Sequence, residues 1–144
     1  MKKPSALRRF IDGNPLIRIL VVRILRLLGR QGSCVFCEIV RGESPRRLVY
    51  QDELVTAFWD AHPAASTHIL IVSNRHIKSL NELQLEDAVL CGHMFTIAKK
   101  LAASEKIQES GYQLVINTGL HAGQTVFHLH MHLRNTCLDK VILS

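Results

Sequence analysis

Cysteine is scarce in this sequence of 144 residues, which contains only Cys34, Cys37, Cys91 and Cys137. So few cysteines exclude the densely cross-linked folds of small secreted domains. Cys34 and Cys37 form the one Cys-x-x-Cys pair, and we expect them to be metal ligands or unreactive thiols in a reducing compartment. The protein is therefore expected to be intracellular, either cytoplasmic or organellar.

An uninterrupted hydrophobic run long enough to cross a membrane is also missing. The most apolar stretch, residues 14–30, is broken by Arg18, Arg23 and Arg26, and arginine in the middle of a membrane is costly. On a helical wheel these arginines gather on one side and the leucines and isoleucines on the other, which predicts a basic amphipathic helix. Such a helix either binds a membrane surface or targets an organelle such as a mitochondrion or plastid, or packs its apolar side on the body or on a partner.

Most of the chain lacks an excess of charge. The net charge of +6 comes from residues 1–33, which contain eight basic side chains and one acidic side chain and so sum to +7. Residues 34–144 carry ten basic and eleven acidic side chains and sum to −1. A nearly neutral body gives no reason to expect a nucleic-acid partner. We therefore divide the chain into a basic N-terminal extension, 1–33, and a single domain, 34–144.

The apolar pattern of the body predicts an α+β fold. A short helix is expected from Cys34 to Gly42, and a long one over 84–104, where apolar residues recur at three- and four-residue spacing. Short apolar runs bounded by turn residues predict about five strands, at 47–50, 54–59, 68–73, 112–117 and 126–133. Short strands with one long helix are typical of an antiparallel sheet that has helices packed against it.

Three histidines alternate with apolar residues in the last predicted strand. Because side chains of a strand alternate between faces, His128, His130 and His132 are expected on one face, with Leu129 and Met131 entering the core on the other. Neutral imidazole is a competent nucleophile near pH 7. Three imidazoles side by side can therefore divide the roles of nucleophile, proton donor and orienting group.

A glycine-containing loop leads directly into this strand. Gly119, Gly123, Gln124 and Thr125 offer main-chain and side-chain N–H or O–H groups that suit a phosphate. The loop and the histidines together indicate phosphoryl or nucleotidyl transfer. The three histidines alone leave open a zinc hydrolase site or a metal-storage tract.

Three separated motifs carry a family resemblance: CVFCEIVRGESP (34–45), FWDAHPAASTHILIVSNRHI (58–77) and GYQLVINTGLHAGQTVFHLHMHL (111–133). Over about 100 residues the chain resembles the histidine-triad (HIT) family and, within it, the Hint branch of purine nucleoside phosphoramidases. The resemblance implies an α+β fold that forms a homodimer through the long helix and the fourth strand. The two protomers would then share one continuous sheet.

The resemblance also implies roles for individual residues. His130 would be the nucleophile and form a covalent nucleotidyl-histidine, His132 would bind the phosphate, and His128 would complete the triad. Asp60 would accept hydrogen bonds from the ribose hydroxyls, and His68 would lie close to the nucleophile. The other implied nucleotide-binding residues are Asn117, Gly123, Gln124 and Thr125 around the phosphate and leaving group, and Phe58, Ile39 and Leu70 around the base.

A zinc site is implied by the same resemblance. Some bacterial-type members of the family bind structural zinc at positions that read Cys34, Cys37, His76 and His128 in this chain. The alternative is that the two thiols are buried for packing alone.

The chain departs from the family pattern after Leu133, where it reads RNTCLDKVILS in place of a glycine-rich turn and a tail that ends near Trp-Pro-Pro. Arg134 stands where the motif usually has an apolar residue. The resemblance implies a hydrolase that cleaves purine nucleoside 5′-phosphoramidates such as adenylylated amines. Because the tail is atypical, a dinucleoside polyphosphate hydrolase and a nucleotide-binding regulatory protein with little turnover stay open as alternatives.

Overall fold

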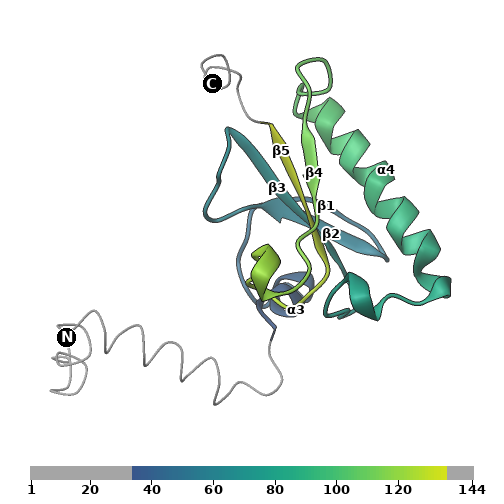
Figure 1. Ribbon diagram of the computed structural model, residues 1–144. Coiled ribbons are helices and arrows are strands. Elements are labelled where there is room, and N and C mark those ends of the chain that lie inside the picture. The colour runs from purple at the N-terminus through teal and green to yellow at the C-terminus, as the bar shows by residue number, and fades with distance from the viewer. Residues whose placement is uncertain (1–33, 136–144) are drawn as a thin grey trace, which may run out of the picture. The chain divides into compact units, whose positions relative to one another are not determined.

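The computed structural model describes residues 34–135, so the predicted helix at 14–30 and most of the atypical tail lie outside the described residues. Figure 1 shows the elements in chain order. The helices and strands are α3 (Val35–Val40), β1 (Leu48–Gln51), β2 (Val55–Trp59), β3 (Thr67–Ser73), α4 (Ala88–Ser104), β4 (Gln113–Val115) and β5 (His130–Asn135). No helix within residues 34–135 is long and apolar enough to cross a membrane.

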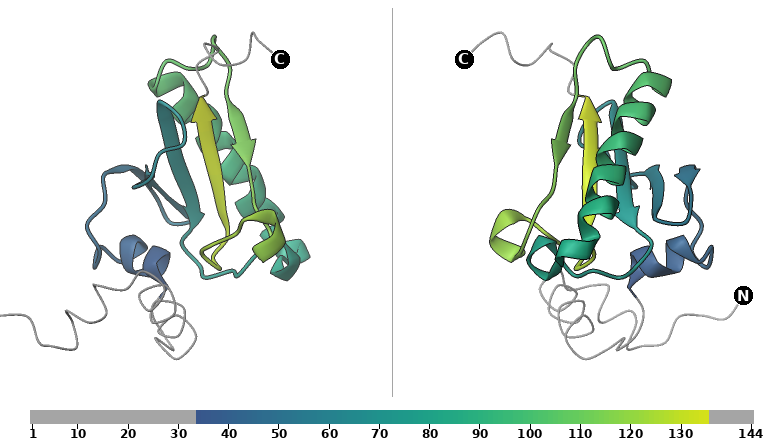
Figure 2. Two further views of the ribbon diagram at one scale, coloured as in Figure 1. Left: turned by 60° about the vertical axis from the view of Figure 1, so that its left-hand side comes forward. Right: turned by 90° about the vertical axis from the view of Figure 1, so that its right-hand side faces the viewer.

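The five strands form one antiparallel sheet in the order β1-β2-β3-β5-β4, which confirms the predicted α+β class. α4 runs along one face of the sheet (Figures 1 and 2). The central strands β3 and β5 are adjacent and antiparallel. Their pairing runs from Thr67 opposite Asn135 to Val72 opposite His130. Since β5 has a hydrogen-bonded neighbour on each side, its side chains are held firmly to their faces.

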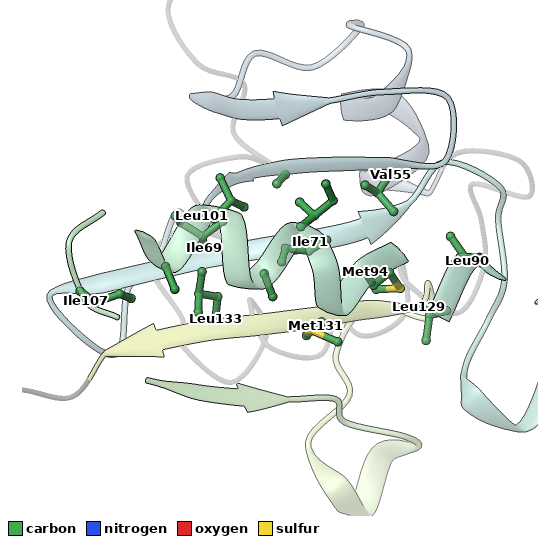
Figure 3. Close-up of a cluster of buried hydrophobic side chains, with 14 of the residues drawn as sticks. Val55, Ile69, Ile71, Leu90, Met94, Leu101, Ile107, Leu129, Met131 and Leu133 are labelled. Atoms are coloured by element: carbon green, nitrogen blue, oxygen red, sulfur yellow. The ribbon is translucent and has the colours of Figure 1, made fainter. Parts of the chain in front are cut away.

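Alternate residues of the strands belong to two separate apolar clusters. Figure 3 shows the larger one, in which α4 packs over one face of β2, β3 and β5. The opposite face of β2 and β3 packs against α3. The smaller cluster has five buried members: Phe36, Ile39, Phe58, Leu70 and Val72.

α4 begins at Ala88, four residues later than the predicted start at residue 84. Leu85–Asp87 form a tighter 3-10 turn before it. The buried carboxylate of Asp87 accepts a hydrogen bond from the main-chain N–H of Gln84 at 2.9 Å, which closes this turn and fixes where the helix starts.

β5 differs from the predicted strand at 126–133, because it begins at His130 and continues to Asn135. Leu129 lies outside the regular pairing of β3 and β5. Its N–H donates to the carbonyl of Ile77 at 2.6 Å, and its carbonyl accepts from the N–H of Ser73 at 3.3 Å. The chain bends at this point, and His128 lies before the strand. The predicted alternation is nevertheless confirmed, since Leu129 and Met131 lie in the α4 cluster while the histidines face the other way.

Candidate active site and metal group

The face of the sheet opposite α4 carries the histidines. Residues paired across antiparallel strands share a face, and His130, His132 and Arg134 pair with Val72, Leu70 and His68. On the other side of β5, Arg134 pairs with Gln113 and His132 with Val115. We call this surface the histidine face; its members on β3, β4 and β5 are His68, Leu70, Val72, Gln113, Val115, His130, His132 and Arg134.

His130 is held with one ring nitrogen free. Its Nδ1 lies 2.6 Å from the main-chain carbonyl oxygen of His128, and since a carbonyl only accepts, this nitrogen carries the proton. Nε2 of neutral His130 therefore has an unshared electron pair. The ring of Phe36 packs edge-on against His130, with ring centroids 5.2 Å apart. Burial lowers the pKa of His130, which keeps the imidazole neutral and nucleophilic near pH 7.

His132 has the opposite arrangement, set by a chain of hydrogen bonds. The N–H of Ala64 donates to Nδ1 of His68 at 3.0 Å, so neutral His68 carries its proton on Nε2. That nitrogen lies 2.8 Å from Nδ1 of His132 and donates to it. Neutral His132 must then carry its own proton on Nε2, which makes this nitrogen a hydrogen-bond donor.

Burial is also the main cause of the low pKa of His132, about 4, with smaller contributions from His130 and His68. Burial lowers the pKa of His68 as well. Both rings are therefore neutral near pH 7. Asp60 lies beside them, with Oδ2 3.4 Å from Nε2 of His68, while its Oδ1 accepts from the N–H of His62 at 2.8 Å. A carboxylate thus borders the histidine face at the end of β2.

The loop before β5 is shaped by Gln124, whose side chain is buried. Its Oε1 accepts from the N–H of Gly119 at 2.8 Å, and its Nε2 donates to the carbonyl of Lys78 at 2.7 Å. Both ends of the amide are thus engaged with the main chain. This geometry favours a role in holding the loop over the direct phosphate contact expected from the sequence. The side chain of the neighbouring Thr125 is exposed.

Asn117 and Gly123 meet in the same loop. Nδ2 of Asn117 donates to the carbonyl of Ala122. Gly123 adopts a φ of +82°, and a Cβ there would lie 3.3 Å from Nδ2 of Asn117. Glycine is therefore favoured at this position both by its backbone conformation and by the space around it.

The three residues expected to line a base pocket are brought together. Ile39 of α3, Phe58 of β2 and Leu70 of β3 all belong to the smaller apolar cluster. Phe58 also packs edge-on against Phe36, with centroids 5.6 Å apart. Asp60 follows β2 directly, two residues after Phe58.

Cys34, Cys37, His76 and His128 form a group that could hold a metal ion. Nδ1 of His128 lies 3.4 Å from Sγ of Cys34, 3.5 Å from Sγ of Cys37 and 3.2 Å from Nδ1 of His76. Tetrahedral zinc, with bonds of about 2.3 Å to sulfur and 2.0–2.1 Å to nitrogen, separates sulfur from nitrogen by about 3.6 Å and two nitrogens by about 3.3 Å. The distances from Nδ1 of His128 to the other three donor atoms therefore match those around a tetrahedral zinc ion.

The protonation of the group fits a metal as well. Nε2 of His128 donates to the carbonyl of Ser73 at 2.6 Å, which turns the unshared pair of Nδ1 toward the two thiols. Burial lowers the pKa of His128, so the ring is the neutral species that binds metals. Burial and the neighbouring Cys34 raise the pKa of the Cys37 thiol, and a cation between the two sulfurs would reverse this effect.

Three contributors to the site were not identified from the sequence. These are the ring of Phe36, the N–H of Ala64 and the carbonyl of Ser73. The two main-chain groups leave no signal in a sequence, because every residue except proline offers both. Phe36 lies between the two cysteines of the Cys-x-x-Cys pair, but an apolar residue there indicates no more than packing.

Comparison with known proteins gives consistent matches. A family described as "Scavenger mRNA decapping enzyme C-term binding" matches residues 33–142. The purine nucleoside phosphoramidase of Escherichia coli (strain K12) is 50% identical over 99 residues, which cover 69% of this chain and 83% of that protein.

Solved structures agree with this result. A HIT family hydrolase from Legionella pneumophila Philadelphia 1 has a TM-score of 0.70 at 41% identity and covers 72% of this chain and 92% of its own. A HIT family hydrolase from Clostridium thermocellum has a TM-score of 0.72 at 41% identity, with coverage of 75% and 94%. The match therefore includes nearly the whole of each of these structures.

Proposed function

The chain belongs to the histidine-triad family, and on this premise we propose that it is a hydrolase of purine nucleoside 5′-phosphoramidates that releases the nucleoside monophosphate. The similarity to a purine nucleoside phosphoramidase supports the substrate class. The observation that carries the chemistry is the hydrogen bond from Nδ1 of His130 to the carbonyl of His128, because it leaves Nε2 free to attack phosphorus.

The reaction would proceed in two displacements. In the first, Nε2 of His130 attacks phosphorus, the phosphorus–nitrogen bond breaks, and the amine leaves with a proton taken up from water. The ring then carries a positive charge, which the carbonyl of His128 stabilises through Nδ1–H. In the second, water attacks phosphorus, the bond between phosphorus and Nε2 breaks with its electron pair returning to the ring, and the water's proton goes to solvent, which releases the monophosphate and restores neutral His130.

The remaining residues would bind the nucleotide. We propose that Nε2–H of His132 donates to a phosphate oxygen, since His68 fixes the proton there. Asp60 would accept from the ribose hydroxyls, and the loop around Gly123 would bring main-chain N–H groups to the phosphate. The other proposed contacts are Asn117 and Thr125 near the phosphate and leaving group, Gln124 as the residue that holds the loop, and Ile39, Phe58 and Leu70 at the base.

We propose zinc as the metal for the Cys2His2 group, in a structural role. Cys34 and Cys37 would join the start of α3 to His76 and to His128. With all four positions filled by protein, the ion would offer no open site for substrate. Its contribution would be to fix His128, whose carbonyl orients the nucleophile.

A homodimer is proposed from the surface of α4. Leu85, Val89 and Phe95 are 90%, 73% and 52% exposed, although they are large and apolar. Val89 and Phe95 lie on α4 outside the cluster that packs on the sheet, and Leu85 lies in the 3-10 turn before α4. Within residues 34–135, β4 is at the edge of the sheet. A second copy could cover both, and light scattering of wild type and Phe95→Glu would test it: a monomeric wild type contradicts the proposal.

For residues 14–30 we propose attachment to an anionic membrane surface in an intracellular compartment, cytoplasmic or organellar. The sequence alone supports this, through the basic and apolar sides of the expected helix. Sedimentation with phosphatidylserine vesicles would test it, and equal binding by a chain that lacks residues 1–33 would contradict it.

The central experiment measures AMP release from adenosine 5′-phosphoramidate by the wild type and by His130→Ala. We expect turnover in the wild type and a loss of three orders of magnitude or more in the variant. His93→Gln, which changes a histidine on α4 that pairs with Asp52, is the matched control and should keep the activity. A folded wild type that binds AMP but releases none from the substrate contradicts the proposed enzyme.

A further inference from the structure

Arg134 is a charged residue on a surface where the rest of the strand carries imidazoles. The family motif usually has an apolar residue at this position, yet the sheet directs the side chain of Arg134 to the histidine face. β5 is hydrogen-bonded on both sides here, with Arg134 paired to His68 on β3 and to Gln113 on β4. A residue pinned from two sides cannot turn to the other face without breaking the register.

The charge of this guanidinium is isolated. Among the members of the histidine face on the described strands, Arg134 alone has a permanent positive charge. Its neighbours His68 and His132 are neutral near pH 7, and the positive charge of Arg134 contributes to the lowering of both pKa values. A substrate phosphate would therefore meet a neutral nucleophile at His130 and a neutral donor at His132, with one fixed cation beside them.

Part of the guanidinium is buried without a partner. Nε of Arg134 is out of contact with solvent and has no hydrogen-bond acceptor among the residues that the structure describes. A buried N–H left unpaired is unfavourable, and buried donors nearly always have partners. The planar guanidinium matches a carboxylate or phosphate, which it binds through two parallel hydrogen bonds. Arg134 also has no ion pair among residues 34–135, so an oxyanion from a ligand would pair with the terminal N–H groups of the guanidinium.

The spacing along β5 indicates where that oxyanion lies. Two strand residues advance the chain by about 6.5–7 Å, so the Cα of Arg134 is about 13 Å from that of His130. The ring of His132 lies between them on the same face. The positive charge of Arg134 contributes to the low pKa of His68 and of His132 and not to that of His130, so the guanidinium lies nearer to His132 and His68 than to His130.

We propose that Arg134 binds a second oxyanion of the substrate, separate from the phosphate that His130 attacks. This inference rests on the proposed function. It makes Arg134 a specificity-determining residue that selects nucleotide substrates with an additional carboxylate or phosphate, carried either on the leaving group or on the ribose. Nucleoside phosphoramidates of acidic amines belong to the first kind, and nucleotides with a ribose phosphate belong to the second.

Calorimetric titration of the full-length protein tests this with three stable probes. AMP carries one phosphate, ADP adds a phosphate on the leaving-group side, and adenosine 3′,5′-bisphosphate adds one on the ribose side. We expect one of the last two to bind the wild type roughly tenfold more tightly than AMP. The gain should fall below about twofold in Arg134→Leu and be partly kept in Arg134→Lys. Which probe gains identifies the side of the substrate that carries the oxyanion.

Arg46→Leu is the matched control, because it removes the same charge from the exposed loop between α3 and β1. It should keep the wild-type ratio of affinities. If Arg134→Leu does not fold, Arg134→Gln replaces it as the test variant, because it also removes the charge. Unchanged ratios for both probes when Arg134 is replaced would overturn the proposal. A wild type that binds AMP and releases none from adenosine 5′-phosphoramidate contradicts the proposed function alone, because the binding ratios still test Arg134.

Discussion

The two ends of the histidine row use the same side chain in opposite ways. At one end, His128 donates through Nε2 to Ser73 and turns Nδ1 toward the cysteines. At the other end, His132 accepts at Nδ1 from His68 and keeps its proton on Nε2. The first ring is prepared to bind a cation and the second to donate to an anion. The difference arises from the partner of each ring, because the residue type is the same.

The largest effect is expected from a substitution in the proposed zinc group at the His128 end of the row. Cys37→Ser removes a proposed zinc ligand, so bound zinc should fall from one ion per chain to near none, and the melting temperature should fall by roughly 10 °C or more. Metal analysis of the purified protein and calorimetry measure the two quantities.

Cys91→Ser is the control for this change, since Cys91 lies on α4 and is not in the metal group. It should keep both the zinc and the melting temperature. If wild type purified with zinc present holds none, or if Cys37→Ser keeps its zinc, the assigned site is wrong.

A smaller effect is expected at the substrate end from His68→Ala. Without the donor at Nδ1, the proton of His132 is free to move from Nε2, and kcat/KM for adenosine 5′-phosphoramidate should fall about 10- to 100-fold. Nitrogen-15 NMR of labelled histidine should find His132 protonated on Nε2 in the wild type and on both nitrogens in exchange in the variant. His68→Gln, whose amide can still donate, should recover part of the activity. A wild type with the His132 proton on Nδ1 would contradict the arrangement.

The smallest effect concerns stability as a function of pH. The pKa of His132 is about 4 in the folded protein, against an ordinary value of 6.5. Between these two values the unfolded chain binds more protons than the folded one, so this stability is present above pH 6.5 and is lost as the pH falls toward 4. The melting temperature of His132→Gln should therefore decline less steeply over this window than that of the wild type. Parallel curves for the two proteins would show that His132 does not titrate in this way.

The two ends of the histidine row differ in their distant partners and not in residue type, and this difference also explains how much of the structure the sequence could predict. The sheet, the long helix and the alternation of histidines with Leu129 and Met131 follow from short-range periodicity, which a sequence displays directly. The start of β5 does not, because it depends on a hydrogen bond from the N–H of Leu129 to Ile77 and one from the N–H of Ser73 to Leu129, and both partners are more than fifty residues away along the chain.

The candidate site divides in the same manner. The triad follows from the alternation of the last strand, whereas Asp60 and the proposed Cys and His ligands are implied by the resemblance to the histidine-triad family. The inward turn of Gln124 toward Gly119 and Lys78, and the proton positions on the rings, depend on main-chain groups of distant segments. Such groups are present at nearly every residue and so leave no mark in the sequence.

The hydrogen bond from His130 to the carbonyl of His128 has a genetic consequence. The acceptor belongs to a peptide bond, so any codon at position 128 still encodes it. Point mutations can remove the proposed metal ligand at that position, or the histidine that orients His132, but no substitution at 128 deletes the oxygen that accepts from the proposed nucleophile. Only chemical replacement of the backbone, such as an ester in place of an amide, changes the strength of this acceptor. The acceptor for the proposed nucleophile is thus unaffected by substitution at position 128, whereas a substitution at position 130 removes the proposed nucleophile itself.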